Sequence, residues 1–194
     1  MSNVTLKNYH IICLEYWQDR EDEDYGSCLW ARFYFNLDKY ELMILSDCGN
    51  YGCGWGETDS ESFLHLMARC SGDYILGKIA RRDIFDFEAT KDALYYDPPR
   101  DNEEKELNKK LDDIFDAFEY EPTTGDDFIR MFDEENDGTF MDTFEMPVYR
   151  YPYGAVRIVE IFDKHIRPKI KEILRENEAL DMTIATKVRE NDIL

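Results

Sequence analysis

Long hydrophobic runs are missing from this sequence. No stretch approaches the roughly 18 to 20 apolar residues that a membrane-spanning helix needs. A secretory signal begins with a basic region followed by an apolar one, and the N-terminal residues 1–8 lack this pattern. Both absences argue against a membrane or exported protein, so we expect a soluble, cytoplasmic one.

Proline, glycine and basic residues are scarce. The 194 residues include 6 prolines and 10 glycines, whereas 43% are hydrophobic and 14% are aromatic, which is enough apolar material for one sizeable core. The 23 basic residues are outnumbered by 43 acidic ones, and the formal net charge is −20. We therefore expect no direct binding to nucleic acid or to an anionic membrane, and an electrostatically attracted partner should be basic.

The cysteine pattern argues against a disulfide framework. Five cysteines, an odd number, are spread through hydrophobic segments, as is typical of free thiols in a reducing compartment. Cys48 and Cys53 have a C-x4-C spacing, and two thiolates this close could share a zinc ion. Two further ligands would have to come from Cys13, Cys28, Cys70, His10 or His65. Buried hydrophobic cysteines are the alternative interpretation.

The first 57 residues predict an antiparallel β-meander of about four strands. Hydrophobic and aromatic runs lie at Tyr9–Trp17, Leu29–Asn36, Glu41–Asp47 and Tyr51–Gly56. Gly49 and Asn50 suit a two-residue hairpin turn, which would pair Ser46 with Cys53. The glycines at 52, 54 and 56 leave one face of the last strand bare, and we expect a helix to lie there.

The remainder of the chain is predicted to be helical. Residues 58–82 begin with a capping-box pattern at Thr58 and Glu61. A strongly acidic helical segment covers 83–145, and a long C-terminal helix region, kinked or restarted by Pro168, covers 146–178. The tail over 179–194 is only weakly patterned. These segments predict a single α+β domain over 1–194, with four or five helices after the meander.

The negative charge is concentrated in residues 83–145, which hold 22 acidic and 6 basic residues. Within them, residues 101–121 predict one amphipathic helix with an apolar stripe that includes Leu111 and Ile114. Such a helix is a negative rod of the same sign as duplex DNA, and it could occupy a basic nucleic-acid channel. A merely solvated acidic face is the alternative. The candidate partner-binding residues are Glu103, Glu106, Asp112, Asp113, Asp116 and Glu119.

No catalytic motif stands out. His10, His65 and His165 lie in no recognisable hydrolase signature. The acidic stretch 133–139 matches an EF-hand loop at only a few positions, and Phe144 stands where the closing carboxylate is needed. We therefore expect no catalytic residues, no calcium site and no enzymatic activity.

The stretch from Ser46 to Gly56 carries an S-D-x-G-x-Y-x-x-x-W-G pattern, and Asp73–Ile79 carries a D-Y-x-x-x-K-x pattern. Both resemble a family of uncharacterised phage and prophage proteins. Tyr151-Pro152 and Arg167-Pro168 resemble the C-terminal part of that family, so the resemblance covers about residues 30–175. The family pattern implies no catalytic residues.

The resemblance implies a biological context. Small acidic proteins of phages and prophages are often inhibitors of host defence, including anti-CRISPR and anti-restriction proteins, and several imitate DNA. We therefore expect a stoichiometric inhibitor that binds a basic host protein, such as a CRISPR effector nuclease or a restriction complex, and blocks nucleic-acid loading. The alternative is a small zinc-binding or structural phage protein whose acidic surface only confers solubility.

Overall fold

The computed structural model describes residues 4–56, 61–141, 143 and 146–177. Contacts divide them into two compact units. The sheet unit comprises the described residues of 1–81 and 153–177, and the helical insert comprises those of 82–152. The α+β class with a four-stranded antiparallel sheet ahead of the helices is confirmed, whereas the single-domain organisation stays a prediction.

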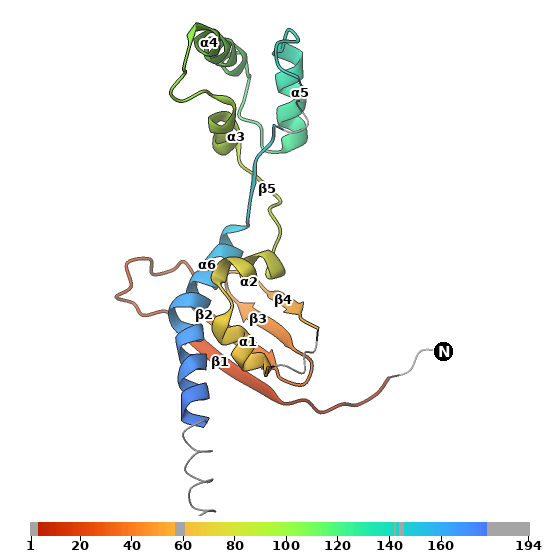
Figure 1. Ribbon diagram of the computed structural model, residues 1–194, viewed down its shortest axis with the longest axis vertical. Helices are drawn as coiled ribbons and strands as arrows, with labels where there is room; N and C mark the ends of the chain where they lie inside the picture. The colour runs from red at the N-terminus through yellow and green to blue at the C-terminus, as the bar shows by residue number, and fades with distance from the viewer. Residues whose placement is uncertain (1–3, 57–60, 142, 144–145, 178–194) are drawn as a thin grey trace, which may run out of the picture. The chain divides into compact units, whose positions relative to one another are not determined.

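The sheet unit is built on a meander in the order β1-β2-β3-β4 (Figure 1). Side chains alternate between buried and exposed along the central strands, as one-sided burial requires. Phe33 and Phe35 point to the buried face, together with Leu42 and Ile44. The strands are β1 (Ile11–Trp17), β2 (Trp30–Asn36), β3 (Glu41–Ser46) and β4 (Tyr51–Gly54).

Three helices cover the buried face of the sheet: α1 (Phe63–Arg69), α2 (Gly72–Ile79) and α6 (Tyr153–Ile161) (Figure 1). Phe63 of α1 packs on Phe35, with ring centroids 6.3 Å apart. The same face receives Phe162, whose ring lies 6.2 Å from that of Phe33. Aromatic and aliphatic groups from both layers therefore form one core.

The predicted two-residue turn between β3 and β4 is wrong. Ile44 pairs with Tyr51 and Leu42 with Cys53, so residues 45–50 separate the last paired positions, and the first two of these still belong to β3. Side chains stabilise this longer loop, because the Asn50 Oδ1 accepts from the Ser46 N–H at 3.2 Å and the Ser46 hydroxyl donates to the Gly49 carbonyl at 2.5 Å. The face bearing Gly52 and Gly54 is exposed, so the predicted helix does not lie on it.

Helix α1 begins later than its sequence pattern indicates. Its N-cap is Ser62, whose hydroxyl accepts from the His65 N–H. Thr58, the predicted cap, lies outside the described residues. The predicted tail at 179–194 lies outside them as well.

The long C-terminal helix changes its hydrogen bonding just before Pro168. Helix α6 passes into a π-helical turn at Phe162–Ile166 and then into an α-helix over 167–177. The Arg167 N–H bonds to the Phe162 carbonyl, five residues back. Because proline has no N–H to donate, this wider turn re-spaces the backbone where an α-helical bond is lost. The helix therefore does not restart at Pro168 but continues to residue 177, whereas the predicted kink stays a prediction.

The helical insert has an aromatic core of its own. Two short strands, β5 (Ile84–Phe85) and β6 (Tyr149–Arg150), pair antiparallel and close its ends. Phe128 and Phe132 are fully buried together with Leu111, and further aromatic rings pack around them. The helices of the insert are α3 (Phe87–Leu94), α4 (Asn102–Asp116) and α5 (Gly125–Glu135).

Helix α4 is shorter than predicted. It starts after its cap Asp101 but ends at Asp116 instead of residue 121. Beyond the end of the helix, the ring of Phe118 stacks against that of Phe87, with centroids 6.3 Å apart. At about 1.5 Å per residue, the negative rod is about 22 Å long rather than about 30 Å.

Candidate acidic interface and thiol cluster

The inward face of α4 determines which of its side chains reach solvent. Leu111 and Ile114 are buried in the core of the insert. Asp101 caps the helix by accepting from the Glu104 N–H at 2.9 Å. The acidic side chains at other angles around the axis therefore point outward. All six predicted partner-binding residues are exposed: Glu103, Glu106, Asp112, Asp113, Asp116 and Glu119.

These six residues do not all occupy equivalent positions. Five lie on α4, whereas Glu119 follows the end of the helix. Asp112 accepts a hydrogen bond from the Tyr95 hydroxyl at 2.7 Å. Burial, reinforced by this bond, raises the pKa of Tyr95, so the tyrosine stays protonated and keeps donating. Asp112 therefore has a structural role that Asp113 and Asp116 do not share among the described contacts.

Three lysines partly offset the negative charge of α4. Lys105, Lys109 and Lys110 are all exposed on the helix. Lys110 donates to the Thr139 hydroxyl at 2.6 Å and forms an ion pair with Asp137 at 3.5 Å. The acidic character of this surface is therefore a property of the whole insert, not of α4 alone.

Helix α5 extends the acidic surface. Its exposed carboxylates are Asp126, Asp133, Glu134 and Glu135. Arg130, a basic residue of α5, is paired with Asp127 at 2.7 Å and Glu134 at 3.3 Å. Because these carboxylates neutralise it, Arg130 leaves little positive potential on this helix.

Residues 133–139 form the end of α5 and a turn, not an EF-hand loop. Asp133, Glu134 and Glu135 are helical, and the chain leaves the helix at Asn136. The Asn136 side chain both donates to and accepts from the backbone of Phe140. The turn therefore satisfies its own polar groups with protein partners.

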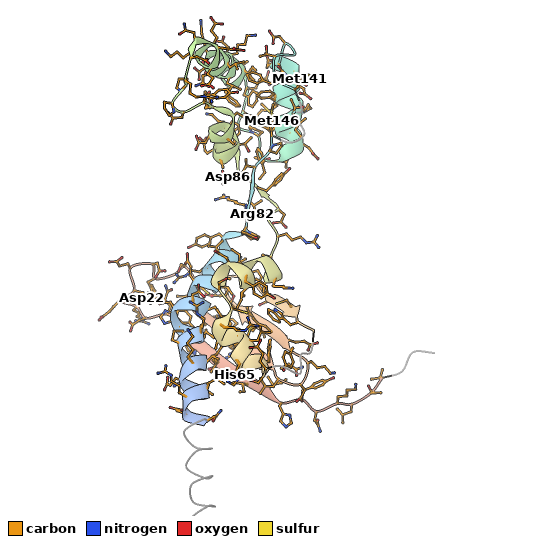
Figure 2. All side chains as sticks on the ribbon, in the orientation of Figure 1. Asp22, His65, Arg82, Asp86, Met141 and Met146 are labelled. Atoms are coloured by element: carbon orange, nitrogen blue, oxygen red, sulfur yellow. The ribbon has the colours of Figure 1, made fainter. Side chains whose placement is uncertain are left out.

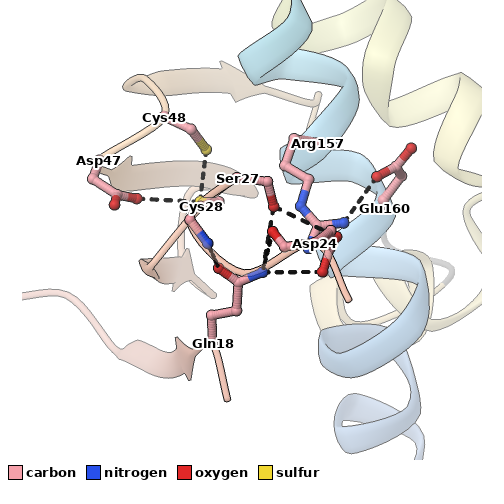
Figure 3. Close-up of polar contacts among 9 residues, drawn as sticks. Gln18, Asp24, Ser27, Cys28, Asp47, Cys48, Arg157 and Glu160 are labelled. Atoms are coloured by element: carbon pink, nitrogen blue, oxygen red, sulfur yellow. Dashed lines mark hydrogen bonds and ion pairs between the residues drawn. The ribbon is translucent and has the colours of Figure 1, made fainter. Parts of the chain in front are cut away.

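A second feature lies in the sheet unit, at the end of the meander where the β1–β2 and β3–β4 loops meet. Figure 3 shows Cys28, Asp47 and Cys48 converging there. The two sulfur atoms are 2.7 Å apart, and the Cys28 Sγ lies 3.3 Å from the Asp47 Oδ1. Cys28 is 1% exposed. Burial, with added effects of Cys48 and Asp47, raises the pKa of the Cys28 thiol well above its ordinary value.

The predicted thiol pair, Cys48 with Cys53, is not the pair that converges. Among the described residues, the group that could hold a metal ion joins Cys48 to Cys28 and Asp47. Cys53 lies opposite Leu42 in the β3–β4 ladder, and burial raises its pKa to about 11. The longer β3–β4 loop explains the difference, because it removes Cys48 from the ladder.

Asp47 is the residue that sequence reasoning missed. It follows β3 directly, and its carboxylate accepts from the backbone N–H groups of Leu29 at 3.0 Å and Trp30 at 3.4 Å. The S-D-C order at residues 46–48 was visible in the sequence, but nothing local indicated that Cys28 would lie beside it.

The described part of the chain has no helix long and apolar enough to span a bilayer.

Comparison with known proteins places the chain in a phage context. No curated protein and no solved structure matches it. A family model described as a phage family, Phage_phiTE_072, matches residues 10–175. The match spans most of both units, and the chain belongs to this phage family.

Proposed function

We propose that this protein inhibits a host defence complex by binding, one to one, to the basic surface with which that complex holds nucleic acid. The observation that carries the proposal is the exposure of all six candidate carboxylates on the helical insert. Membership of a phage family supports it, because small acidic phage proteins are often inhibitors of host defence. The family match itself assigns no target.

The charge distribution supports a basic protein as the partner. Residues 83–145 carry 22 acidic against 6 basic residues. Duplex DNA carries one negative charge about every 1.7 Å, so the insert is sparser than DNA but has the same sign. A basic channel would attract this surface, and occupation of the channel would exclude the nucleic acid. A CRISPR effector nuclease or a restriction complex has such a channel.

The core of the insert favours binding without chemistry. Helices α4 and α5 are anchored by buried residues, including Leu111 and Phe132, so the exposed carboxylates lie on a packed, rigid scaffold. A preformed surface loses less conformational entropy on binding than a disordered acidic tail does. We expect stoichiometric inhibition and no catalytic turnover.

The test is an affinity capture from nuclease-treated host lysate at low and high salt. A basic nucleic-acid-binding complex should be retained at low salt and released at high salt, because screening weakens charge pairing. The captured complex is then assayed for nucleic-acid binding with increasing amounts of the protein. Inhibition should be complete near one equivalent.

A charge-reversed variant locates the interface. Asp113→Lys, Asp116→Lys and Glu119→Lys are combined, and Asp112 is left intact because it accepts from Tyr95. The matched control combines Glu21→Lys, Glu23→Lys and Glu176→Lys, which changes the net charge equally but outside the insert. The first variant should lose inhibition and the control should keep it. Equal loss in both would mean that the acidic surface contributes only bulk charge and solubility.

A further inference from the structure

The strand register explains why three ligand-type side chains meet at one end of the sheet. Ala31 of β2 pairs with Ser46 of β3. The residues just before β2 therefore run beside those just after β3, which brings Cys28 next to Asp47 and Cys48. The juxtaposition depends on the main sheet, not on a flexible side chain.

We propose that Cys28, Cys48 and Asp47 form a binding site for a thiophilic divalent cation of the zinc class. Two sulfur ligands select zinc over calcium or magnesium, which prefer oxygen, and a carboxylate oxygen completes a set that zinc accepts. Each of these residues can supply one ligand atom, and the three atoms lie within 4.8 Å of one another. The proposal replaces Cys53 by Cys28 and Asp47, and it is independent of the proposed inhibitory function.

The distances require only a small rearrangement. With Zn–S bonds of about 2.3 Å, two sulfurs in a tetrahedral shell are about 3.8 Å apart, so the sulfurs at 2.7 Å would separate by about 1 Å. The Cys28 Sγ to Asp47 Oδ1 distance of 3.3 Å already suits two ligands of one ion. Cys48 is half-buried at the loop and can make this movement.

The surroundings hold the ligands in place. The Asp47 carboxylate is fixed by the backbone N–H groups of Leu29 and Trp30. The Ser46 hydroxyl lies 3.4 Å from the Cys48 sulfur. The carbonyl of Gly154, in α6, lies 4.0 Å from the same sulfur. Water can supply the fourth ligand. Partners of this kind orient metal ligands in characterised sites.

Gly154 shows how closely α6 approaches the site. A Cβ at this position would lie 1.9 Å from the Cys48 carbonyl oxygen. Only glycine permits this approach, and the Cys48 backbone therefore lies directly against the start of α6. Three separate segments of the sheet unit therefore converge on the cluster.

A divalent cation suits the chemistry of this cluster. With both thiols deprotonated, the two sulfurs and the carboxylate would carry three negative charges within 4.8 Å of one another. A divalent ion would neutralise most of that charge and replace the two thiol protons. Formation of a disulfide between the two sulfurs, 2.7 Å apart, is the competing chemistry, and it needs an oxidant.

The test uses the purified full chain, reduced and stripped of metal. Co²⁺ is added as a spectroscopic probe for thiolate ligation and is then displaced by Zn²⁺, and bound metal is counted by elemental analysis. We expect one ion per chain and a sulfur-to-cobalt charge-transfer band. Cys28→Ser and Cys48→Ser should each abolish that band or weaken binding by about tenfold or more.

Matched controls make the result decisive. Cys53→Ser and Cys13→Ser each remove a thiol outside the cluster and should leave binding unchanged. Asp47→Asn keeps both thiols and should weaken binding while leaving the circular dichroism spectrum intact, which covers the case in which a cysteine variant misfolds. The proposal is overturned if the reduced chain binds no stoichiometric metal, if Cys53→Ser abolishes binding equally, or if Cys28 and Cys48 are recovered only as a disulfide.

Discussion

The guanidinium of Arg157 on α6 contacts the carboxylate of Asp24 in the loop between β1 and β2, with 2.5 Å between Nη2 and Oδ2. Figure 3 shows the same carboxylate bonded to the amide of Gln18. The Arg157 side chain is 13% exposed. The pair thus ties an acidic loop, which also carries Asp22 (Figure 2), to the C-terminal helix.

This pair should stabilise the sheet unit. Asp24→Asn leaves a largely buried guanidinium with a weaker partner, so we expect a loss of about 1 to 2 kcal/mol in the free energy of unfolding. Urea unfolding followed by tryptophan fluorescence measures it, because Trp17, Trp30 and Trp55 all belong to the sheet unit. Glu160→Gln, which alters the more exposed i,i+3 partner of Arg157, should cost only about 0.5 kcal/mol or less. Equal losses of unfolding free energy in the two variants would contradict a specific stabilising role for the pair of Arg157 and Asp24.

The stability of the helical insert should fall in acid through Glu104. Hydrogen bonds from the side chain and backbone of Arg100 hold the pKa of Glu104 below its usual value. A lowered pKa means that the stabilisation is complete above the unfolded-state pKa of about 4.3 and is lost as the pH falls through the folded value. Glu104→Gln should therefore reduce the protection of α4 amides at pH 7, and this difference should shrink toward pH 3.

Hydrogen exchange with mass spectrometry measures that protection for α4 separately. Glu103→Gln, at a neighbouring exposed position, is the control and should have little effect at either pH. If the variant Glu104→Gln lowers the protection of the α4 amides by the same amount down to pH 3, the contact with Arg100 is not the source of that protection.

Three of the thiols should differ in their reactivity toward an alkylating reagent. Cys13 is exposed and should be modified first. Burial raises the pKa of Cys53 to about 11, so at pH 8 its thiolate fraction is about 100-fold or more below that of an ordinary cysteine. Cys28 is buried and should also be protected. Timed labelling with peptide mass spectrometry gives the order, and early labelling of Cys53 would contradict its placement.

The insert should depend on its aromatic and aliphatic core. Leu111 is fully buried, so Leu111→Ala should cost about 2 to 5 kcal/mol and expose the amides of α4 and α5 to exchange. Leu107→Ala removes the same group from a half-buried position on the same helix and should cost less. If the amides of α4 and α5 exchange equally fast in the two variants, α4 does not pack through the face that carries Leu111.

Several elements could be predicted because their signals are local. The hydrophobic and aromatic run Leu29–Asn36 indicated β2, and the spacing of Leu111 and Ile114 indicated α4 with its exposed acids. The four-strand order followed from short connections between consecutive strands. The candidate acidic residues were correctly placed on the surface for the same reason.

Other features depended on contacts that the sequence does not reveal locally. Gly49-Asn50 suited a tight turn, but Asp47 gains its hydrogen bonds from Leu29 and Trp30 only in a longer loop. Helix α3 lies within the segment predicted to be helical, but its bounds were not predicted. It begins after Asp86 (labelled in Figure 2), whose carboxylate accepts from the Ala89 N–H. Cys28 meets Cys48 across 20 residues, through the sheet register.

The β5–β6 pairing sets Ile84 beside Arg150 and Phe85 beside Tyr149, so the first and last strands of the insert run side by side. A segment whose ends are adjacent can be exchanged or shortened without stretching the chain on either side. The acidic residues of 83–145 thus lie on a segment whose length and sequence can change while its two ends stay paired.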